Sequence, residues 1–227
     1  MLLNIFNGSP RGKRSNSAIL TRAFAKGFCD SRTFPGNRFE EFFLADPEDF
    51  EKAPEAFFKE STALLAFPIY VDAMPGITKK FIEALEPYKG RCEFMRTLFL
   101  VQTGFPEETH TRPMKNYLLK LGRRLGAPSP GVIRMGGGEG ARHRGKKLLQ
   151  RYEDLGRIYA ETGKLDEKIL ASLTGPRRLP SLRVRLILPL ANYFFWDRQL
   201  KRNGAYAKRF ARPLEEMPEA AAETPER

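Results

Sequence analysis

TALLAFPI, residues 62–69, places this chain among the α/β proteins. The run carries no charge and is almost continuously apolar, which is typical of a strand buried on both faces of a parallel sheet. RTLFLVQT, residues 96–103, has the same character, and residues 77–85 between the two runs have apolar residues at helical spacing. Two buried strands joined by a helix predict a right-handed βαβ unit.

The same alternation continues on both sides of this unit. Further strands are predicted at residues 2–6, 38–44 and 131–135, and a helix is expected between the second and third strands. Five strands within residues 1–163 fit the flavodoxin-like order 2-1-3-4-5, a three-layer sandwich around a parallel sheet. The remaining predicted helices of this sandwich are residues 15–28, 113–125 and 144–162.

Beyond Gly163 the strand alternation stops, and Pro176, Pro180 and Pro189 interrupt the chain. The most helical later part is residues 190–202, which Asn203-Gly204 would end. We therefore expect a flavodoxin-like domain at residues 1–163, a basic and mostly helical extension at 164–214, and an acidic flexible tail at 215–227.

The formal charge of +12 is concentrated in the extension. Between Gly175 and Arg212 there are ten Arg and Lys residues and a single acid, Asp197. Phe194 to Trp196 lie beside several of these arginines, so this segment can form a peripheral contact with an anionic membrane surface. The alternative is that the aromatic residues pack on the body or on a second subunit. Pro189 breaks any long amphipathic helix and favours that alternative, and a nucleic-acid partner is not expected.

Cysteine and histidine are too few for several kinds of site. Cys29 and Cys92 form no CxxC pair, and His110 and His143 lack zinc-ligand spacing, so we expect no disulfide framework, cysteine-held cluster or metal site. Free thiols favour a reducing compartment, which predicts a cytoplasmic protein. No apolar run approaches the roughly 20 residues of a membrane-spanning helix.

GSPRGKRSNS, residues 8–17, follows the first predicted strand and opens directly into a helix. Small residues, hydroxyls, basic side chains and the positive end of a helix together suit a phosphate group. The alternative is a simple turn with Ser15 as the helix N-cap. A Walker loop requires GxxxxGK[ST], but only three residues separate Gly8 from Gly12 and Arg14 follows Lys13, so that assignment fails.

Three further loops follow the later strands. PIYVDAMPG, residues 68–76, offers backbone hydrogen-bonding groups beside an aromatic ring and a thioether, which suit a flat heteroaromatic ligand, although the prolines can equally serve only to shape a turn. QTGFPEE, residues 102–108, again combines glycine with an aromatic residue. GGGEG, residues 136–140, fits GxGxxA through Ala141, but we interpret it as a rim of the site rather than a second nucleotide loop.

Taken in order, NGSPRGKRSNSA, PIYVDAMPG, TGFPE and RMGGGEG resemble the four loops of the NADPH-dependent FMN reductase family, within the flavodoxin-like superfamily. The resemblance covers about residues 1–160, and four ordered motifs are far more specific than any one of them. ANYFFWDRQLKRNG, residues 191–204, also resembles the C-terminal piece of some uncharacterised members.

The resemblance implies an FMN site built mainly from loops, with NADPH or NADH as electron donor and a homodimer as the assembly. It implies that the flavin carries the chemistry, so that no catalytic side chain is required. Asp72 and Glu107 are interpreted as loop charges or caps rather than catalytic acids. The implied phosphate contacts are Ser9, Arg11, Ser15, Asn16 and Ser17; those flanking the ribityl chain and ring are Pro68, Ile69, Tyr70, Val71 and Met74; and those closing its far side are Thr103, Gly104 and Phe105.

The expected function is therefore an FMN-dependent oxidoreductase that passes hydride from NAD(P)H to a small acceptor, such as a quinone, a nitro- or azo-aromatic, a flavin or a metal chelate. One alternative is a flavodoxin-type electron carrier without a substrate of its own. Its typical representatives are acidic and short, whereas this chain is basic and extended. The other alternative is a flavoprotein that binds anionic membrane surfaces.

Overall fold

The computed structural model describes residues 1–138, 145–180, 182, 185, 189–190 and 192–211. The chain divides into two compact units, Met1–Arg178 and Leu179–Arg227. The first unit contains the whole sheet and is described first.

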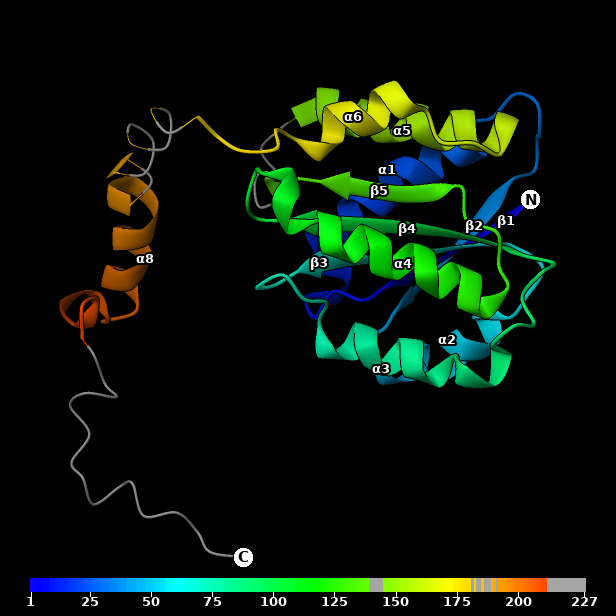
Figure 1. Cartoon of the computed structure of the whole chain (residues 1–227), viewed down its shortest axis with the longest axis horizontal. Helices are drawn as coiled ribbons and strands as arrows, with labels where there is room; N and C mark the ends of the chain where they lie inside the picture. Colours follow the sequence, from blue (N-terminus) through cyan, green and yellow to red (C-terminus); the bar gives the residue numbers. More distant parts are fainter. Residues whose placement is uncertain (139–144, 181, 183–184, 186–188, 191, 212–227) are drawn as a thin grey trace, which may run out of the picture. The chain divides into compact units, whose positions relative to one another are not determined.

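A five-stranded parallel sheet forms the centre of the first unit (Figure 1). Its order is β2-β1-β3-β4-β5, so the sequence-based prediction of the flavodoxin-like order is confirmed. The strands are β1 (Leu2–Asn7), β2 (Arg38–Phe43), β3 (Thr62–Ile69), β4 (Arg96–Thr103) and β5 (Gly131–Met135).

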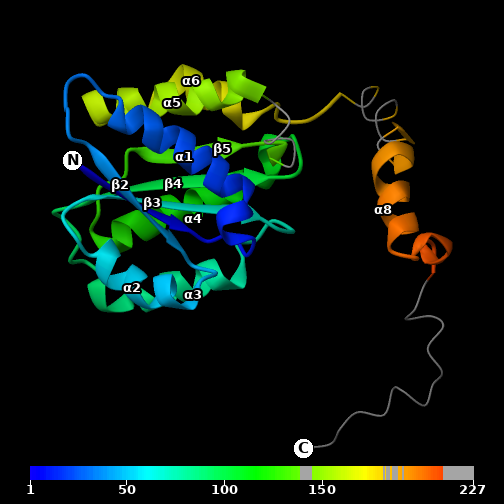
Figure 2. The same ribbon diagram turned by 180° about the vertical axis from the view of Figure 1, so that it is seen from behind.

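Helices cover both faces of the sheet, as parallel strands require. Figures 1 and 2 show α1, α5 and α6 on one face and α2, α3 and α4 on the other. Their bounds are α1 Asn16–Cys29, α2 Pro47–Phe57, α3 Gly76–Ala84, α4 Arg112–Leu125, α5 Gly145–Thr162 and α6 Glu167–Thr174.

β3 explains why the core has two halves. All eight of its residues are buried, and alternate side chains of a strand point to opposite faces. Leu64 and Ala66 therefore pack under α1 and α5, whereas Leu65 and Phe67 pack toward α2, α3 and α4. The uncharged run that predicted a buried strand is thus explained by helices on both of its sides.

Two glycines let α1 approach α5 closely. A Cβ built on Gly27 would lie 1.7 Å from the Glu153 carbonyl oxygen, and one on Gly156 would lie 2.0 Å from that of Phe24. No larger residue fits at either position without moving backbone.

The first unit continues beyond the boundary that the sequence suggested at residue 163. Leu165 and Leu173 are buried in the core half that contains α1 and α5, and α6 lies against β5. Asp166 is the N-cap of α6, where its Oδ1 accepts a hydrogen bond of 2.8 Å from the Ile169 N–H. The unit therefore ends at Arg178 because α6 supplies buried side chains to the core.

The described part of the second unit includes a π-helical turn, Asn192–Trp196, followed by α8, Asp197–Arg202. α8 is capped by Asn203, and Gly204 follows with a φ of +66°, in agreement with the predicted helix end. The expected acidic tail at 215–227 lies outside the described residues. Among the described residues no helix is both long and apolar enough to cross a membrane.

Candidate functional site

Four loops meet at the carboxyl edge of the sheet, where open α/β sheets bind their ligands. We call them loop 1 (residues 8–15, after β1), loop 3 (70–75, after β3), loop 4 (104–111, after β4) and loop 5 (136–138, the described residues after β5). Together they contain most of the residues that the sequence singled out.

Asn7, the last residue of β1, organises loop 1. Its Oδ1 accepts a hydrogen bond of 3.0 Å from the Ser9 N–H, and its Nδ2 donates to Ser15 Oγ at 3.2 Å. Ser15 Oγ also accepts from the Ala18 N–H at 3.1 Å, which makes Ser15 the N-cap of α1. Ser9 and Ser15 therefore hold the loop in shape, and Asn7, which the sequence reasoning passed over, is the residue that joins them.

The two serines of loop 1 and the first residues of α1 are buried, whereas Pro10, Arg11, Lys13 and Arg14 of the loop are exposed. Ser9 and Ser15 are each 1% exposed, Asn16 is 6% exposed and Ser17 is fully buried. The Ser17 hydroxyl has no hydrogen-bond partner in the described part of the chain. A buried hydroxyl without a partner costs free energy, so its place at the positive end of α1 indicates a site for an acceptor group.

Gly8 lies where no side chain can fit. A Cβ at this position would come 2.1 Å from Thr78 Oγ1, and Thr78 Oγ1 donates a hydrogen bond of 2.9 Å to the Gly8 carbonyl. Thr78 belongs to α3 and is fully buried. The glycine therefore allows loop 1 to dock directly on α3.

Hydrogen bonds connect the four loops around the edge of the sheet. Asn16 Nδ2 donates to the Gly138 carbonyl at 2.9 Å, which joins the start of α1 to loop 5. The Gly137 N–H donates to the Phe105 carbonyl at 2.8 Å, which joins loop 5 to loop 4. His110 Nδ1 lies 2.9 Å from Asp72 Oδ1, joining loop 4 to loop 3, and the bond from Thr78 to Gly8 joins α3, the helix that follows loop 3, to loop 1.

Loops 3 and 4 present large apolar side chains to solvent. Val71 is 97% exposed, Phe105 is 60% exposed and Tyr70 is 44% exposed. Ile69 and Thr103, the strand ends behind them, are buried. This exposed apolar rim lies on the same edge of the sheet as the polar loop 1, and the combination suits a flat, partly apolar ligand.

The turn in loop 3 is strained. Tyr70 and Ala73 pair through two backbone hydrogen bonds of 2.9 and 3.0 Å, and the residues between them, Val71 and Asp72, have φ values of +47° and +61°. A β-branched residue rarely adopts positive φ, and strained residues persist where the surrounding structure holds them. In this turn the Val71 side chain faces solvent and the Asp72 carboxylate faces His110.

His110 contacts both loops that form the rim. Its ring stacks on Phe105 with 4.6 Å between centroids, while its Nδ1–H donates to the Asp72 carboxylate. The sequence reasoning treated Asp72 as a solvated charge or cap and gave His110 no role. The pairing was not visible in the sequence because the two residues are 38 positions apart on different loops.

An ion pair anchors loop 4 to β5. Arg134 Nη1 lies 2.9 Å from Glu108 Oε1, and the hydrogen bond from this guanidinium lowers the pKa of the Glu108 carboxyl. The Glu108 N–H also donates to the Pro176 carbonyl at 2.9 Å. Loop 4 is thus held at its base while Phe105 remains exposed.

A basic hollow of about 410 Å³ lies beside loop 1. It is lined by Arg11, Lys13 and Arg14 from the loop and by Phe43 and Asp46 from the far side, and the Lys13 ammonium lies 5.7 Å from the centre of the Phe43 ring. The three basic residues bring positive charge to the outer side of loop 1, whereas Ser17 lies in the first turn of α1 and does not line this hollow.

The structure places the residues chosen from the sequence at one edge of the sheet. They separate into a buried group in loop 1 and at the strand ends and a more exposed group on the rim, while Glu139 and Gly140 of the fourth motif lie outside the described residues. The buried group is Ser9, Ser15, Asn16, Ser17, Pro68, Ile69 and Thr103, Met74 is half-buried, and the exposed group is Arg11, Tyr70, Val71, Gly104 and Phe105. Their role in holding a cofactor stays a prediction.

Comparison with known proteins yields similarity in structure only. No family model matches the chain, and no curated protein does. An NADH:FMN oxidoreductase solved in its apo form matches with a TM-score of 0.54 and 17% identity, over 80% of this chain and 98% of that one. An NAD(P)H:quinone oxidoreductase from Methanothermobacter marburgensis matches with a TM-score of 0.53 and 17% identity, over 70% and 96%.

An FMN-dependent NADH-azoreductase from Bacillus anthracis, solved in complex with FMN, matches with a TM-score of 0.53 and 12% identity, over 70% of this chain and all of that one. At such identities the likeness concerns the fold. Together with the strand order, it shows that this chain has the flavodoxin-like fold.

Proposed function

We propose that the protein is an FMN-dependent oxidoreductase that uses NADH or NADPH as electron donor. The observation that carries this proposal is the buried Ser17 hydroxyl at the N-terminus of α1, which has no hydrogen-bond partner among the described residues and follows a loop held in shape by Asn7 and Ser15. A phosphate oxygen is the natural acceptor for this hydroxyl. The sequences of the four motifs and their order along the chain support FMN as the group that carries the phosphate.

The residues present fit a phosphate at loop 1. The first turn of a helix leaves its N–H groups without intrahelical acceptors, so the amides of Asn16 and Ser17 can donate to the same anion as Ser17 Oγ. Arg11 supplies positive charge on the outer side of the loop. Ser9 and Ser15 act through Asn7 by holding the loop in shape.

The rim fits the isoalloxazine ring. When bound, FMN supplies the redox chemistry, accepting hydride from the nicotinamide and passing electrons to an acceptor. Tyr70, Val71 and Phe105 provide apolar surface that excludes water from the ring. Met74, Thr103 and the strand ends behind them limit how deeply the ring can lie. His110 and Asp72 keep loops 3 and 4 at a fixed separation through their hydrogen bond.

The acceptor that we propose is a small, flat, oxidised molecule. The structural neighbours are an FMN reductase, a quinone reductase and an azoreductase by their descriptions, and an exposed aromatic rim suits each of these substrate classes. We place quinones and nitro- or azo-aromatics first, because Phe105 and Tyr70 can stack on them. Free flavin and metal chelates complete the set.

The absorption spectrum of the purified protein tests this proposal. We expect the protein to bind FMN in a fixed ratio, and the bound flavin to bleach on addition of NADH or NADPH without air and to recover its colour on addition of a quinone. A flavin that binds but is bleached by neither nucleotide would instead identify an electron carrier. A protein that stays colourless in excess FMN would contradict the proposal altogether.

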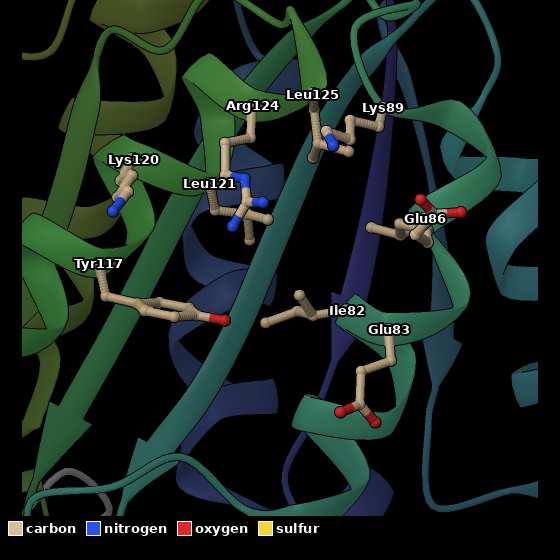
Figure 3. Close-up of a pocket in the computed structure, with 10 residues that line it drawn as sticks. Ile82, Glu83, Glu86, Lys89, Tyr117, Lys120, Leu121, Arg124 and Leu125 are labelled. Atoms are coloured by element: carbon tan, nitrogen blue, oxygen red, sulfur yellow. The ribbon is translucent and has the colours of Figure 1, made fainter.

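We further propose a homodimer formed through α3 and α4. A groove of about 390 Å³ lies between these helices, and apolar Ile82 and Leu121 are among the side chains that line it (Figure 3). Glu83, Glu86 and Lys89 line one side, where Glu83 is also paired with Lys79, and Lys120 and Arg124 line the other. In a two-fold arrangement the glutamates of one copy can meet Lys120 and Arg124 of its partner.

Light scattering on the eluting protein tests this assembly. Tyr117 lines the groove and is 44% exposed, so Tyr117→Glu should shift the protein to a monomer. Asn116 precedes it in the chain but does not line the groove, so Asn116→Glu should leave the dimer intact. A wild-type protein that is monomeric at every concentration would contradict the dimer.

A cytoplasmic location is proposed from the thiols. Cys29 and Cys92 are both unpaired, and burial raises the pKa of each, which keeps them protonated and unreactive. Fractionation of cells that express the tagged chain, with a check of the thiol state, tests this location.

A further inference from the structure

The second unit exposes an unusual cluster of aromatic side chains. Tyr193, Phe194, Phe195 and Trp196 are consecutive and are 66%, 55%, 51% and 56% exposed, and Phe210 is 82% exposed. Single exposed apolar residues are common on proteins, but contiguous ones mark a surface that binds something. The proposed flavin site makes no use of any of them.

Basic residues follow these aromatics directly along the helix. Arg198, Lys201 and Arg202 belong to α8, and Arg209 follows it. The Arg198 guanidinium lies 6.0 Å from the centre of the Phe194 ring, and that of Arg209 lies 4.0 Å from that of Tyr206. The described segment therefore carries an aromatic turn and a basic turn side by side, with cations resting on aromatic faces.

The charge of the segment identifies an anionic partner. Residues 175–212 hold ten basic residues and one acid, Asp197. Tyr and Trp prefer the boundary between head groups and acyl chains, and Lys and Arg bind lipid phosphates just outside it. The aromatic turn is only five residues long, so it can enter this boundary but cannot cross a bilayer of about 30 Å.

The apolar composition favours a bilayer over nucleic acid. Single-stranded nucleic acid is bound by aromatic stacking and basic residues, which are present here. The sequence from 179 to 200 also contains many aliphatic residues, including exposed Leu182 and Leu190, 68% and 58% exposed. Aliphatic side chains add nothing to base stacking, but they partition into lipid.

We propose that residues 190–211 dock the protein on an anionic phospholipid surface, with Tyr193 to Trp196 inserted at the head-group boundary and Arg198, Lys201, Arg202 and Arg209 on lipid phosphates. The docking does not depend on flavin binding. A failure of one proposal therefore leaves the other standing, because a colourless protein can still bind vesicles and a yellow one can fail to bind them.

Trp196 allows a direct test on the full-length protein, because it is the only tryptophan in the chain. Addition of vesicles containing phosphatidylglycerol should shift its fluorescence to shorter wavelength, and lipids brominated on their acyl chains should quench it. Vesicles of phosphatidylcholine alone should give little change, and salt should reverse the shift by screening the basic residues.

Matched variants separate the basic turn from overall charge. Arg198→Gln/Lys201→Gln/Arg202→Gln should weaken vesicle partitioning about 100-fold, since each basic residue near an anionic surface contributes about fivefold. Lys52→Gln/Lys146→Gln/Lys168→Gln removes the same charge from exposed positions of the first unit and should change partitioning less than about threefold. Phe194→Ser/Phe195→Ser should weaken partitioning while leaving the salt dependence unchanged.

Three results would overturn the docking proposal. The first is a Trp196 spectrum unaffected by anionic vesicles at low salt. The second is a response to single-stranded oligonucleotides without any to vesicles, which would assign the surface to nucleic acid. The third is a blue shift that appears on raising protein concentration alone, which would assign the aromatics to a second copy of the chain.

Discussion

Loop 1 and the rim formed by loops 3 and 4 lie on the same edge of the sheet, but they are built in opposite ways. Loop 1 holds its buried serines, Ser9 and Ser15, in internal hydrogen bonds, and the first turn of α1 contains Ser17, whose buried hydroxyl has no partner among the described residues. The rim is exposed and apolar, and it contains backbone strain at Val71 and Asp72. In the proposed function this contrast separates two tasks: loop 1 and the start of α1 hold the cofactor, and the rim admits substrates that come and go.

The largest effect on FMN affinity should follow from adding a methyl group at the contact between loop 1 and α3. Gly8→Ala places a methyl group 2.1 Å from Thr78 Oγ1 and forces loop 1 away from α3. Overpacking of this kind costs about 1–3 kcal/mol of stability, and we expect FMN affinity to fall about 100-fold. Quenching of FMN fluorescence measures it. Gly76→Ala, where an added Cβ meets nothing within 4 Å, is the matched control. Equal affinities for the two variants would show that loop 1 does not bind the cofactor.

Ser17→Ala should have opposite effects on stability and binding. The substitution removes a buried hydroxyl that lacks a partner among the described residues, so the FMN-free protein should be as stable as wild type or more stable. A hydrogen bond to a charged group is worth about 1.5–3 kcal/mol, so FMN affinity should fall about 10- to 100-fold. Urea denaturation and FMN titration measure the two changes. A drop in stability with unchanged affinity would assign Ser17 to the core.

Val71 tests the strain of the rim. Asn tolerates positive φ better than Val, so Val71→Asn should raise the free energy of unfolding by about 1 kcal/mol. Val71 is 97% exposed, so no packing is lost. Val71→Ala removes the branched side chain without the tolerance of Asn and should gain less. FMN affinity should change little in either variant, whereas KM for an aromatic acceptor should rise. Thermal melting and steady-state kinetics distinguish a relaxed turn from a disrupted one.

The smallest expected effect on stability concerns the ion pair between Arg134 and Glu108, which anchors loop 4 to β5. Arg134 lowers the pKa of the Glu108 carboxyl, so this pair stabilises the fold above the ordinary pKa of glutamate and loses its contribution as pH falls through the lowered value. Arg134→Gln should reduce stability by less than about 1 kcal/mol at pH 7 and by nothing in strong acid. Urea denaturation across this range, repeated in a Glu108→Gln background, isolates the pair. A difference that persists in acid would assign the loss to packing of the Arg134 side chain.

The architecture of the first unit could be predicted from sequence because its signals are local. TALLAFPI and RTLFLVQT are buried strands in the structure, and GSPRGKRSNS turns from a strand into a helix as its small and polar residues indicated. α6 escaped prediction because it is only eight residues long and stands among prolines. The sequence signals for this helix were the N-cap Asp166 and the apolar residues that follow it. Only the structure shows that these apolar residues are needed to pack against the sheet.

The sequence by itself determined the parallel sheet, the four loops and the concentration of positive charge after Gly175, since periodicity, turn chemistry and charge depend on near neighbours. Tertiary structure alone decided which groups face one another. Asn7 joins Ser9 to Ser15, Thr78 closes on Gly8, and His110 reaches Asp72 across 38 residues of sequence. These contacts form only when the crossovers bring the strand ends together, and no local pattern reports the satisfied or unsatisfied state of a buried hydroxyl such as that of Ser17.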